Sequence, residues 1–436
     1  MTTACAGLTV VDLTQGMVAL AGMILADNGA EVIKIEPPGG DWARDEPGFL
    51  MWNRGKRGVV LDLTREADRA VAVGLAERAD VVIESFRPGV AERLGLGYEE
   101  LAARNPGLVY CSISGYGRMG ELSGRKGYEG AVAAKLGRMI GLDRISGAVP
   151  GQDREYPIYT AAPVASYGAS QLAVQGIVSA LLARQSTNRG QKVETSLLQA
   201  STAFMMRGLA RDDGQIVAGP TPPTIRRGIE LCFLTAECSD GKYVQMCARQ
   251  DHHFRDWMKA IGLAEVLEDP TYAKAPLGIA RLEDIEALEE RIREKMRQKP
   301  QAEWMRLFIE EYDVGADPFL TPEEFLAHPQ MVLNGRVVEI EDPTVGRTKQ
   351  VGPLVLFSKT PSQIGRPAPR LDEHGAEIRA RAAHANGAPK IAPTNGAGAP
   401  ARRPLAGVTI LEVAYFLAGP FSTTILADMG ARVIKV

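Results

Sequence analysis

Basic side chains lie at the ends of runs of apolar, β-branched residues in the first hundred positions. One group is NRGKR (Asn53–Arg57), and another is ESFRPG (Glu84–Gly89), which is followed by Arg93. Open α/β sheets bind ligands at strand ends, and arginine and lysine at such positions suit phosphate groups. The same charges would also be ordinary in a solvated loop. The pattern leaves two interpretations, a phosphate-binding sheet edge and an exposed surface.

A glycine motif follows the predicted strand LVYCSIS (Leu108–Ser114). GYGRMG (Gly115–Gly120) satisfies G-x-G-x-x-G, the fingerprint of dinucleotide-binding sheets. That fingerprint needs an apolar helix directly after it, whose dipole faces the pyrophosphate. Here the next residues, ELSGRKGYEG, are polar and rich in glycine. We therefore expect a loop beside a site and no nicotinamide cofactor.

The composition excludes several classes of function. A formal net charge of -3, with both signs spread along 436 residues, argues against nucleic acid binding. Five cysteines, with no C-x-x-C, favour a reducing cytoplasm. His252 and His253 are adjacent and cannot face one metal from the same turn of a helix, so we expect no metal. The N-terminus has no signal-peptide pattern, and Ala161–Ala183 carries polar residues on several faces, so we expect a core helix and no membrane association.

The predicted elements favour an α/β fold. Strand-like runs at 8–13, 31–36, 58–63, 80–86 and 108–114 alternate with helical patterns, which is typical of a doubly wound, Rossmann-like parallel sheet. A long helical stretch is expected from Ala165 to Met206. A smaller α+β domain follows, with a strand pair at 230–237 and 242–248. The expected organisation is a large domain at 1–224, a small domain at 225–330, a return to the large domain at 331–379, and an Ala/Gly/Pro-rich linker at 380–403.

The start of the chain recurs near its end. LADNGAEVIKI (25–35) matches LADMGARVIKV (426–436), and AGLTVVD (6–12) matches AGVTILE (406–412). The copies lie about 400 residues apart, which is the length of a whole unit and far longer than a solenoid repeat. We interpret 404–436 as the truncated start of a second unit in a tandem duplication.

Taken together, these segments resemble the family III CoA-transferases of CaiB/BaiF type, a group that contains formyl-CoA:oxalate CoA-transferase, the carnitine CoA-transferases and α-methylacyl-CoA racemase. The resemblance spans Ala6 to about Ile378. It is carried by VVDL, LADNGAEVIKIEPPGGD, WNRGKRGVVLDL, ADVVIESFRPGVAERLGLGYEEL, NPGLVYCSISGYG, GQKVETSLLQA, DGKYVQMC, VVEIEDPTVG and VGPLVLFSKTP. It implies a large domain built from both ends of the unit, a small domain, and two interlocked subunits.

The resemblance also implies where coenzyme A, as acyl-CoA substrate, would bind. Carried over position by position, the contacts fall on Met17, Val18, Leu61, Asp62, Leu63, Thr64, Ser85, Phe86, Arg87, Arg93, Arg125, Lys126, Gly127 and Tyr128. Transferases of this family attack the donor acyl-CoA with an aspartate in a PVAD-like segment, and CoA then passes to a second acid. Here that segment is APVASYGAS, and its aspartate position holds Ser166.

This departure affects the expected chemistry. A serine ester would be a stable dead end, and no histidine lies nearby in sequence to act as its base. GQIVAGPTPPT stands where some members have a glycine-rich active-site loop, and Tyr128 and Glu129 stand where the racemase histidine would fall. Glu129 keeps a carboxylate near the site, either as a catalytic group or as a partner for Lys126 or a backbone amide.

The favoured hypothesis is that this chain is the partner unit of a fused, two-unit CoA-transferase whose aspartate chemistry belongs to the second unit. The fusion would replace an interlocked homodimer by an intramolecular pair. Two alternatives are half of a dimethylsulfoniopropionate CoA-transferase/lyase and a non-catalytic scaffold that binds CoA. A racemase is less favoured because its His and Asp pair is missing.

Overall fold

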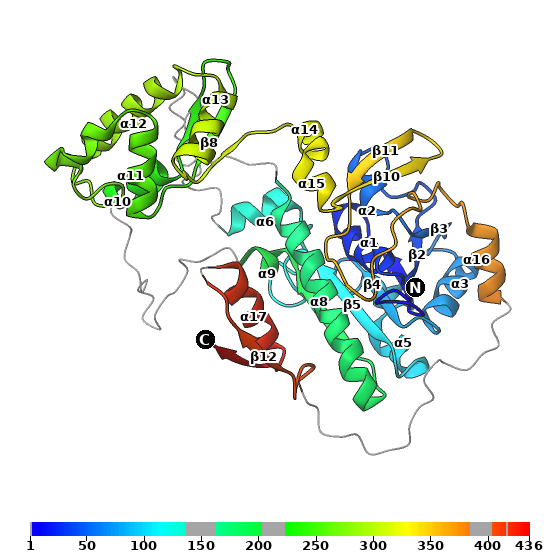
Figure 1. Ribbon diagram of the computed structural model, residues 1–436. Coiled ribbons are helices and arrows are strands. Elements are labelled where there is room, and N and C mark those ends of the chain that lie inside the picture. The colour runs from blue at the N-terminus through cyan, green and yellow to red at the C-terminus, as the bar shows by residue number, and fades with distance from the viewer. Residues whose placement is uncertain (1, 137–161, 203–222, 384–402, 416) are drawn as a thin grey trace. The chain divides into compact units, whose positions relative to one another are not determined.

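The computed structural model of the chain describes residues 2–136, 162–202, 223–415 and 417–436, which form two compact units (Figure 1). The first unit holds the described residues before 203 together with those from His328 onward. The second unit holds residues 223–327. The predicted loop at 214–222 and the linker residues 384–402 lie outside the described residues.

Six parallel strands form the sheet of the first unit. They are β1 (Thr9–Leu13), β2 (Glu31–Glu36), β3 (Arg57–Val60), β4 (Val81–Glu84), β5 (Val109–Ser114) and β6 (Lys192–Ser196), in the spatial order β3-β2-β1-β4-β5-β6. This is the strand order of doubly wound sheets, in which ligands bind at the carboxyl ends where the order reverses. The reversal lies between β1 and β4. The predicted fold class is confirmed.

Helices cover both faces of this sheet (Figure 1). They are η1 (Gly16–Ala19), α1 (Leu20–Asp27), α2 (Gly48–Trp52), α3 (Glu66–Ala76), α4 (Val90–Arg93), α5 (Tyr98–Arg104), α6 (Glu129–Lys135), α8 (Val164–Thr187), α9 (Leu197–Thr202) and α16 (Gly375–Ala383). Side chains of α1 and α8 pack on one face, for example Leu25 and Ile177 on Val10 and Cys111. The side chains of α3, α5 and α16 pack on the other face. Since α16 comes from the C-terminal part, both ends of the chain build this core.

The long helix is shorter than its sequence pattern predicts. The helix α8 ends at Thr187, and Asn188 is left-handed with a φ of 51°. A Cβ on Gly190 would lie 1.9 Å from the Leu108 oxygen, so only glycine allows this close approach. Residues Lys192–Ser196 then pair with β5 as β6. The expected helix from Ala165 to Met206 was therefore wrong, because pairing with a distant strand overrides the local helical pattern.

The second unit is a small α+β body. It contains α10 (Pro223–Cys232), β7 (Thr235–Glu237), β8 (Tyr243–Met246), α11 (Asp251–Ala260), η2 (Ala264–Leu267), η3 (Pro270–Tyr272), α12 (Leu282–Met296), α13 (Gln301–Arg306), η4 (Leu307–Glu311), β9 (Ala316–Pro318) and α14 (Pro322–Ala327). Its strands form an antiparallel sheet in the order β7-β8-β9. Trp257 and Phe308 lie in its core. The strand expected to begin at Glu230 begins only at Thr235, because residues 230–232 complete α10.

The C-terminal part contains two further local structures. After α15 (Pro329–Leu333), β10 (Val337–Asp342) and β11 (Gly346–Val351) form an antiparallel hairpin. Then β12 (Thr409–Glu412), α17 (Ala418–Asp428) and β13 (Arg432–Lys435) repeat the strand-helix-strand pattern of β1, α1 and β2. Both copies pair in parallel, with Thr9 opposite Glu31 and Thr409 opposite Arg432. The sequence repeat therefore folds as the same local structure twice.

Candidate functional site

Most of the residues expected to contact CoA follow the carboxyl ends of four strands of the parallel sheet, of which β1, β4 and β5 are adjacent and β3 is separated from β1 by β2. They come after β1 (Met17, Val18), β3 (Leu61–Thr64), β4 (Ser85–Arg87) and β5 (Arg125–Tyr128). The loops after β1 and β4 flank the point where the strand order reverses, and the Gln15 amide lies 3.4 Å from the Ser85 Oγ atom. The fold thus brings these segments to one edge of one sheet.

A buried ion pair, Lys34 and Asp41, bonds the backbone at the start of the loop after β1. Lys34 on β2 donates to the Thr14 carbonyl oxygen (2.9 Å) and to the Asp41 carboxylate (2.8 Å). The Asp41 carboxylate also accepts the Gly16 amide at 3.0 Å. Both charged side chains are buried. A buried ion pair that also bonds the backbone fixes the start of this loop.

A second buried pair holds the far end of the same loop. Lys56 donates to the Asp12 carboxylate, to the Ala19 carbonyl oxygen (both 2.7 Å) and to the Asn53 side chain (2.9 Å). Burial lowers the pKa of Lys56 to about 8, against the opposing effect of Asp12. A Cβ at Gly22 on α1 would lie 2.4 Å from the Asp12 Oδ2 atom, so the pair needs glycine there.

The NRGKR segment therefore does not serve as a phosphate site. It ends at Arg57, the first residue of β3, so it lies at the opposite end of that strand from the ligand edge. Arg54 makes a bidentate bond to Asp27 (3.1 and 2.7 Å), and both Arg54 and Lys56 are buried. Arg57 pairs with Glu31 and Glu377. Arg54 and Lys56 therefore fit neither interpretation of the sequence pattern, because they are buried and carboxylates distant in sequence neutralise them.

Four other cations remain available at the ligand edge. Arg87, Arg93, Arg125 and Lys126 are exposed, and within the described part of the chain none has a carboxylate within 4.0 Å. Arg118 differs from them because it bridges Glu92 and Glu194. Exposed, unpaired cations beside a sheet crevice suit phosphate oxygens.

The glycine motif forms a loop. Within residues 115–128 the chain is not helical, and α6 begins only at Glu129. Gly115 and Gly127 pack backbone against backbone, since a Cβ on Gly127 would lie 2.1 Å from the Gly115 Cα atom. This contact fixes the Arg125–Tyr128 segment to the end of β5. The helix that a dinucleotide fingerprint requires does not follow the motif.

Ser166 and Glu129 meet at the N-terminus of α8. The Glu129 carboxylate accepts the Ala165 amide (2.7 Å), the Ser166 amide (2.8 Å) and the Ser166 hydroxyl (2.8 Å). The buried Glu129 carboxylate therefore caps the N-terminus of α8 by accepting three hydrogen bonds. Ser170, one turn later, donates to the Ser166 carbonyl oxygen and lies 3.5 Å from that of Val18. The loop after β1 therefore reaches the start of α8.

Sequence reasoning missed Glu84 and the buried Lys34 and Asp41. A signal was present, because strands of a parallel sheet are near-continuous apolar runs and a charge inside one is unusual. VVIE and EVIKIE both carry such a charge. Burial raises the pKa of Glu84 to about 7, although the nearby Ser112 side chain and the bond from the Phe86 amide oppose this rise.

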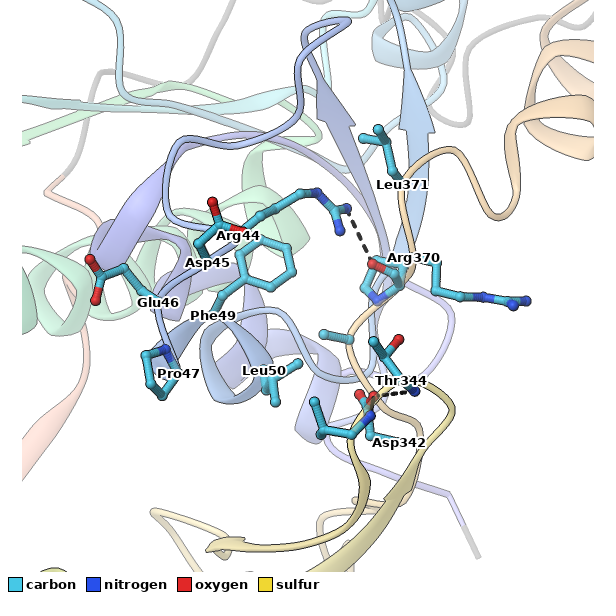
Figure 2. Close-up of a pocket in the computed structure, with 13 residues that line it drawn as sticks. Arg44, Asp45, Glu46, Pro47, Phe49, Leu50, Asp342, Thr344, Arg370 and Leu371 are labelled. Atoms are coloured by element: carbon cyan, nitrogen blue, oxygen red, sulfur yellow. Dashed lines mark hydrogen bonds between the residues drawn. The ribbon is translucent and has the colours of Figure 1, made fainter.

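Described residues of the first unit line two pockets that contain no residue expected to bind CoA. One, of about 580 Å³, lies between residues 44–50, the β10–β11 turn and residues 368–371 (Figure 2). There the Arg44 guanidinium stacks 4.7 Å from the Phe49 ring and bonds Glu36 and the Pro369 carbonyl oxygen. The other, of about 350 Å³, lies beside β5 and β6 and is lined partly by Ser112, Ser114 and Arg118.

The described residues hold no cluster of three or more potential metal ligands, and no described helix is long and apolar enough to cross a membrane. A family model described as CoA-transferase family III matches residues 5–375 and again 405–436. The chain belongs to this family, which confirms the resemblance.

Known proteins agree with this assignment. Acetyl-CoA:oxalate CoA-transferase of Acetobacter aceti is 32% identical over 394 residues, covering 86% of this chain and 94% of that protein. The CoA-transferase/lyase DddD of a Marinomonas species is 28% identical over 99% of this chain, which spans 56% of DddD. A CaiB/BaiF family protein from Brucella suis has a similar crystal structure, with a TM-score of 0.70, 28% identity, and coverage of 88% of this chain and all of that one.

Proposed function

We propose that this chain binds the CoA moiety of an acyl-CoA along the carboxyl ends of β1, β3, β4 and β5, and acts as one unit of a two-unit CoA-transferase. The four unpaired cations Arg87, Arg93, Arg125 and Lys126 support the placement of the phosphates. The loop after β1, held by two buried ion pairs, would support the pantetheine end near α8. The acceptor would be a free carboxylic acid, as in the names of several relatives.

The observation that carries the partner-unit assignment is that Ser166, bonded to Glu129, stands at the N-terminus of α8 where the family has its aspartate. In the proposed reaction an enzyme carboxylate attacks the acyl-CoA thioester, which forms a mixed anhydride and releases CoA thiolate; the thiolate then attacks the enzyme carbonyl carbon, which forms an enzyme thioester and releases the donor acid. The acceptor carboxylate attacks this thioester to form a second anhydride and free thiolate, and attack of the thiolate on the acceptor carbonyl gives the product thioester and restores the enzyme carboxylate. Ser166 offers a hydroxyl at this position, and its bond to Glu129 is already made. The Glu129 carboxylate already accepts three hydrogen bonds, so its oxygens are engaged and less available to attack a thioester. We therefore assign the covalent steps to a second unit.

The repeat after residue 404 supports a fused partner. It folds as β12, α17 and β13 with the register of the first copy, and the family model matches it separately. The alternative partner is a second copy of the chain in an interlocked homodimer. A PVAD-like segment about 130 residues beyond the second copy, the spacing that the first unit shows, would distinguish a fused unit from a homodimer.

The decisive experiment compares two substitutions in the protein that carries both units. Replacing the aspartate of the second unit by alanine should abolish CoA transfer between an acyl-CoA and a free acid. Ser166→Ala in the first unit should leave most of the transfer intact. Full activity after loss of that aspartate, or complete loss of activity in Ser166→Ala with CoA binding intact, would refute the assignment.

A second candidate is half of a dimethylsulfoniopropionate CoA-transferase/lyase. The observation that favours it is the match to a CoA-transferase/lyase over 99% of this chain and 56% of that relative, which is what one unit of a tandem would give. The discriminating assay is release of dimethyl sulfide from dimethylsulfoniopropionate in the presence of acetyl-CoA. A purely scaffolding unit would instead bind CoA in calorimetry and leave turnover unchanged when its cationic residues are substituted. For each of these three candidates, the transferase unit, the transferase/lyase half and the scaffold, we propose a cytoplasmic location.

A further inference from the structure

Glu84 occupies the end of β4, beside the point where the strand order reverses. It immediately precedes the Ser85–Arg87 segment of the proposed CoA site and is buried. Its Oε2 atom accepts the Phe86 amide at 2.7 Å, and Ser112 lies opposite Glu84 on the neighbouring strand β5. The geometry of this loop therefore depends directly on the Glu84 carboxyl group.

Glu84 differs from three other buried carboxylates in or beside the same sheet. Asp12 pairs with Lys56, Asp41 with Lys34 and Glu36 with Arg44. Among the described residues no cation lies within 4.0 Å of Glu84. A buried carboxylate without a cationic partner is the kind of group that is readily protonated near neutral pH.

The charged and titratable groups around Glu84 come from three elements. Glu92 faces it from α4, Arg118 faces it from the loop after β5, and Tyr110 and Cys111 lie on β5 itself. Burial is the largest influence on the pKa of Glu84, which is raised to about 7, and Glu92 adds to the rise while Arg118 opposes it. Arg118 is itself engaged by Glu92 and Glu194, which limits its effect.

We propose that Glu84 is a positioning residue for the CoA loop and that CoA binding is accompanied by uptake of a proton from solvent onto its carboxyl group. The proposal rests on the CoA site proposed above. Phosphates bound by Arg87 and Arg93 would bring negative charge close to Glu84 and disfavour its anion. The neutral carboxyl group can still accept the Phe86 amide through its carbonyl oxygen while its new O–H donates to Ser112, so the loop geometry is kept.

The experiment is calorimetric titration of the chain with CoA between pH 6 and pH 9, in buffers of different ionisation enthalpy, which reports the protons taken up per CoA. The wild type should take up protons near pH 7. If bound phosphates raise the pKa of Glu84 by about one unit, the Kd of the wild type should increase with rising pH by about tenfold more than the Kd of Glu84→Gln. Glu92→Gln, which removes a nearby exposed charge, is the matched control and should keep most of the proton uptake.

The outcomes separate the two proposals. Equal proton uptake by wild type and Glu84→Gln, with CoA bound by both, would overturn the role of Glu84 and leave the CoA site standing. Absence of binding to the wild type would refute the site itself. If Glu84→Gln does not fold, Ser112→Ala supplies the test. Ser112 lowers the pKa of Glu84, so its loss should move the midpoint of proton uptake to higher pH, and an unchanged midpoint would also overturn the proposal.

Discussion

Substitution of Lys56 by methionine tests whether buried charges hold the loop after β1. Methionine has a similar length but cannot donate, so the Asp12 carboxylate would lose its closest cation inside the sheet. The Ala19 carbonyl oxygen would lose its 2.7 Å bond at the other end of the loop. Both pair members are fully buried, so solvent cannot replace the missing charge.

The expected loss of stability is large. Breaking a buried ion pair by removing one partner costs about 3–5 kcal/mol, because the remaining charge is uncompensated. Typical domains have only about 5–15 kcal/mol of stability in all. Adding Asp12→Asn to Lys56→Met removes the stranded charge while an oxygen still accepts from Thr14, so we expect the double variant to recover about 2 kcal/mol or more relative to Lys56→Met alone.

The assay is urea unfolding followed by far-UV circular dichroism, with hydrogen exchange of β1 and α1 peptides to assign the loss to the first unit. Lys259→Met in the second unit is the control, because Lys259 forms an exposed pair with Asp256 and should contribute less than about 1 kcal/mol. A loss below about 1 kcal/mol in Lys56→Met, or a double variant less stable than Lys56→Met, would refute the reasoning.

Three further predictions concern the ligand edge. Gly127→Ala should displace the Arg125–Tyr128 loop and weaken CoA binding, because the new Cβ atom would overlap the Gly115 backbone. Gly124→Ala is the control, since a Cβ atom there meets open space and CoA affinity should match that of the wild type; equal CoA affinities of the two variants would contradict the prediction. Glu129→Ala should lower the free energy of unfolding by about 1–3 kcal/mol and speed hydrogen exchange in the first turn of α8, because two buried amides lose their acceptor. Unchanged exchange there would show that another group caps the helix. Because the pKa of Glu84 is raised, the folded chain binds more protons than the unfolded chain between about pH 4.5 and pH 7. The free energy of unfolding should therefore fall as the pH rises through this window, by up to about 3 kcal/mol. The urea midpoints at pH 5 and pH 8 should differ less in Glu84→Gln than in the wild type.

The sequence by itself determined the first five strands of the parallel sheet, with ends within about three residues, and the repeat that folds as the second strand-helix-strand copy. These features follow from short-range properties. Apolar runs of strand length alternate with helical periodicity, as in the 31–36 strand, and a glycine follows the helix before it. The motifs were also sufficient to identify the family, because many of them occur in one order along the chain.

Only the tertiary structure decided how the charged and polar residues are used. Lys56 and Arg54 are neutralised by carboxylates 44 and 27 residues away, and no local pattern announces such partners. Pairing with β5 ends α8 at Thr187 and creates β6, which the helical pattern concealed. Glu129 reaches Ser166 across 37 residues, while Glu84 is left without a cation. Spacing along the chain sets the elements, but the electrostatic environment of a side chain depends on which distant elements pack around it.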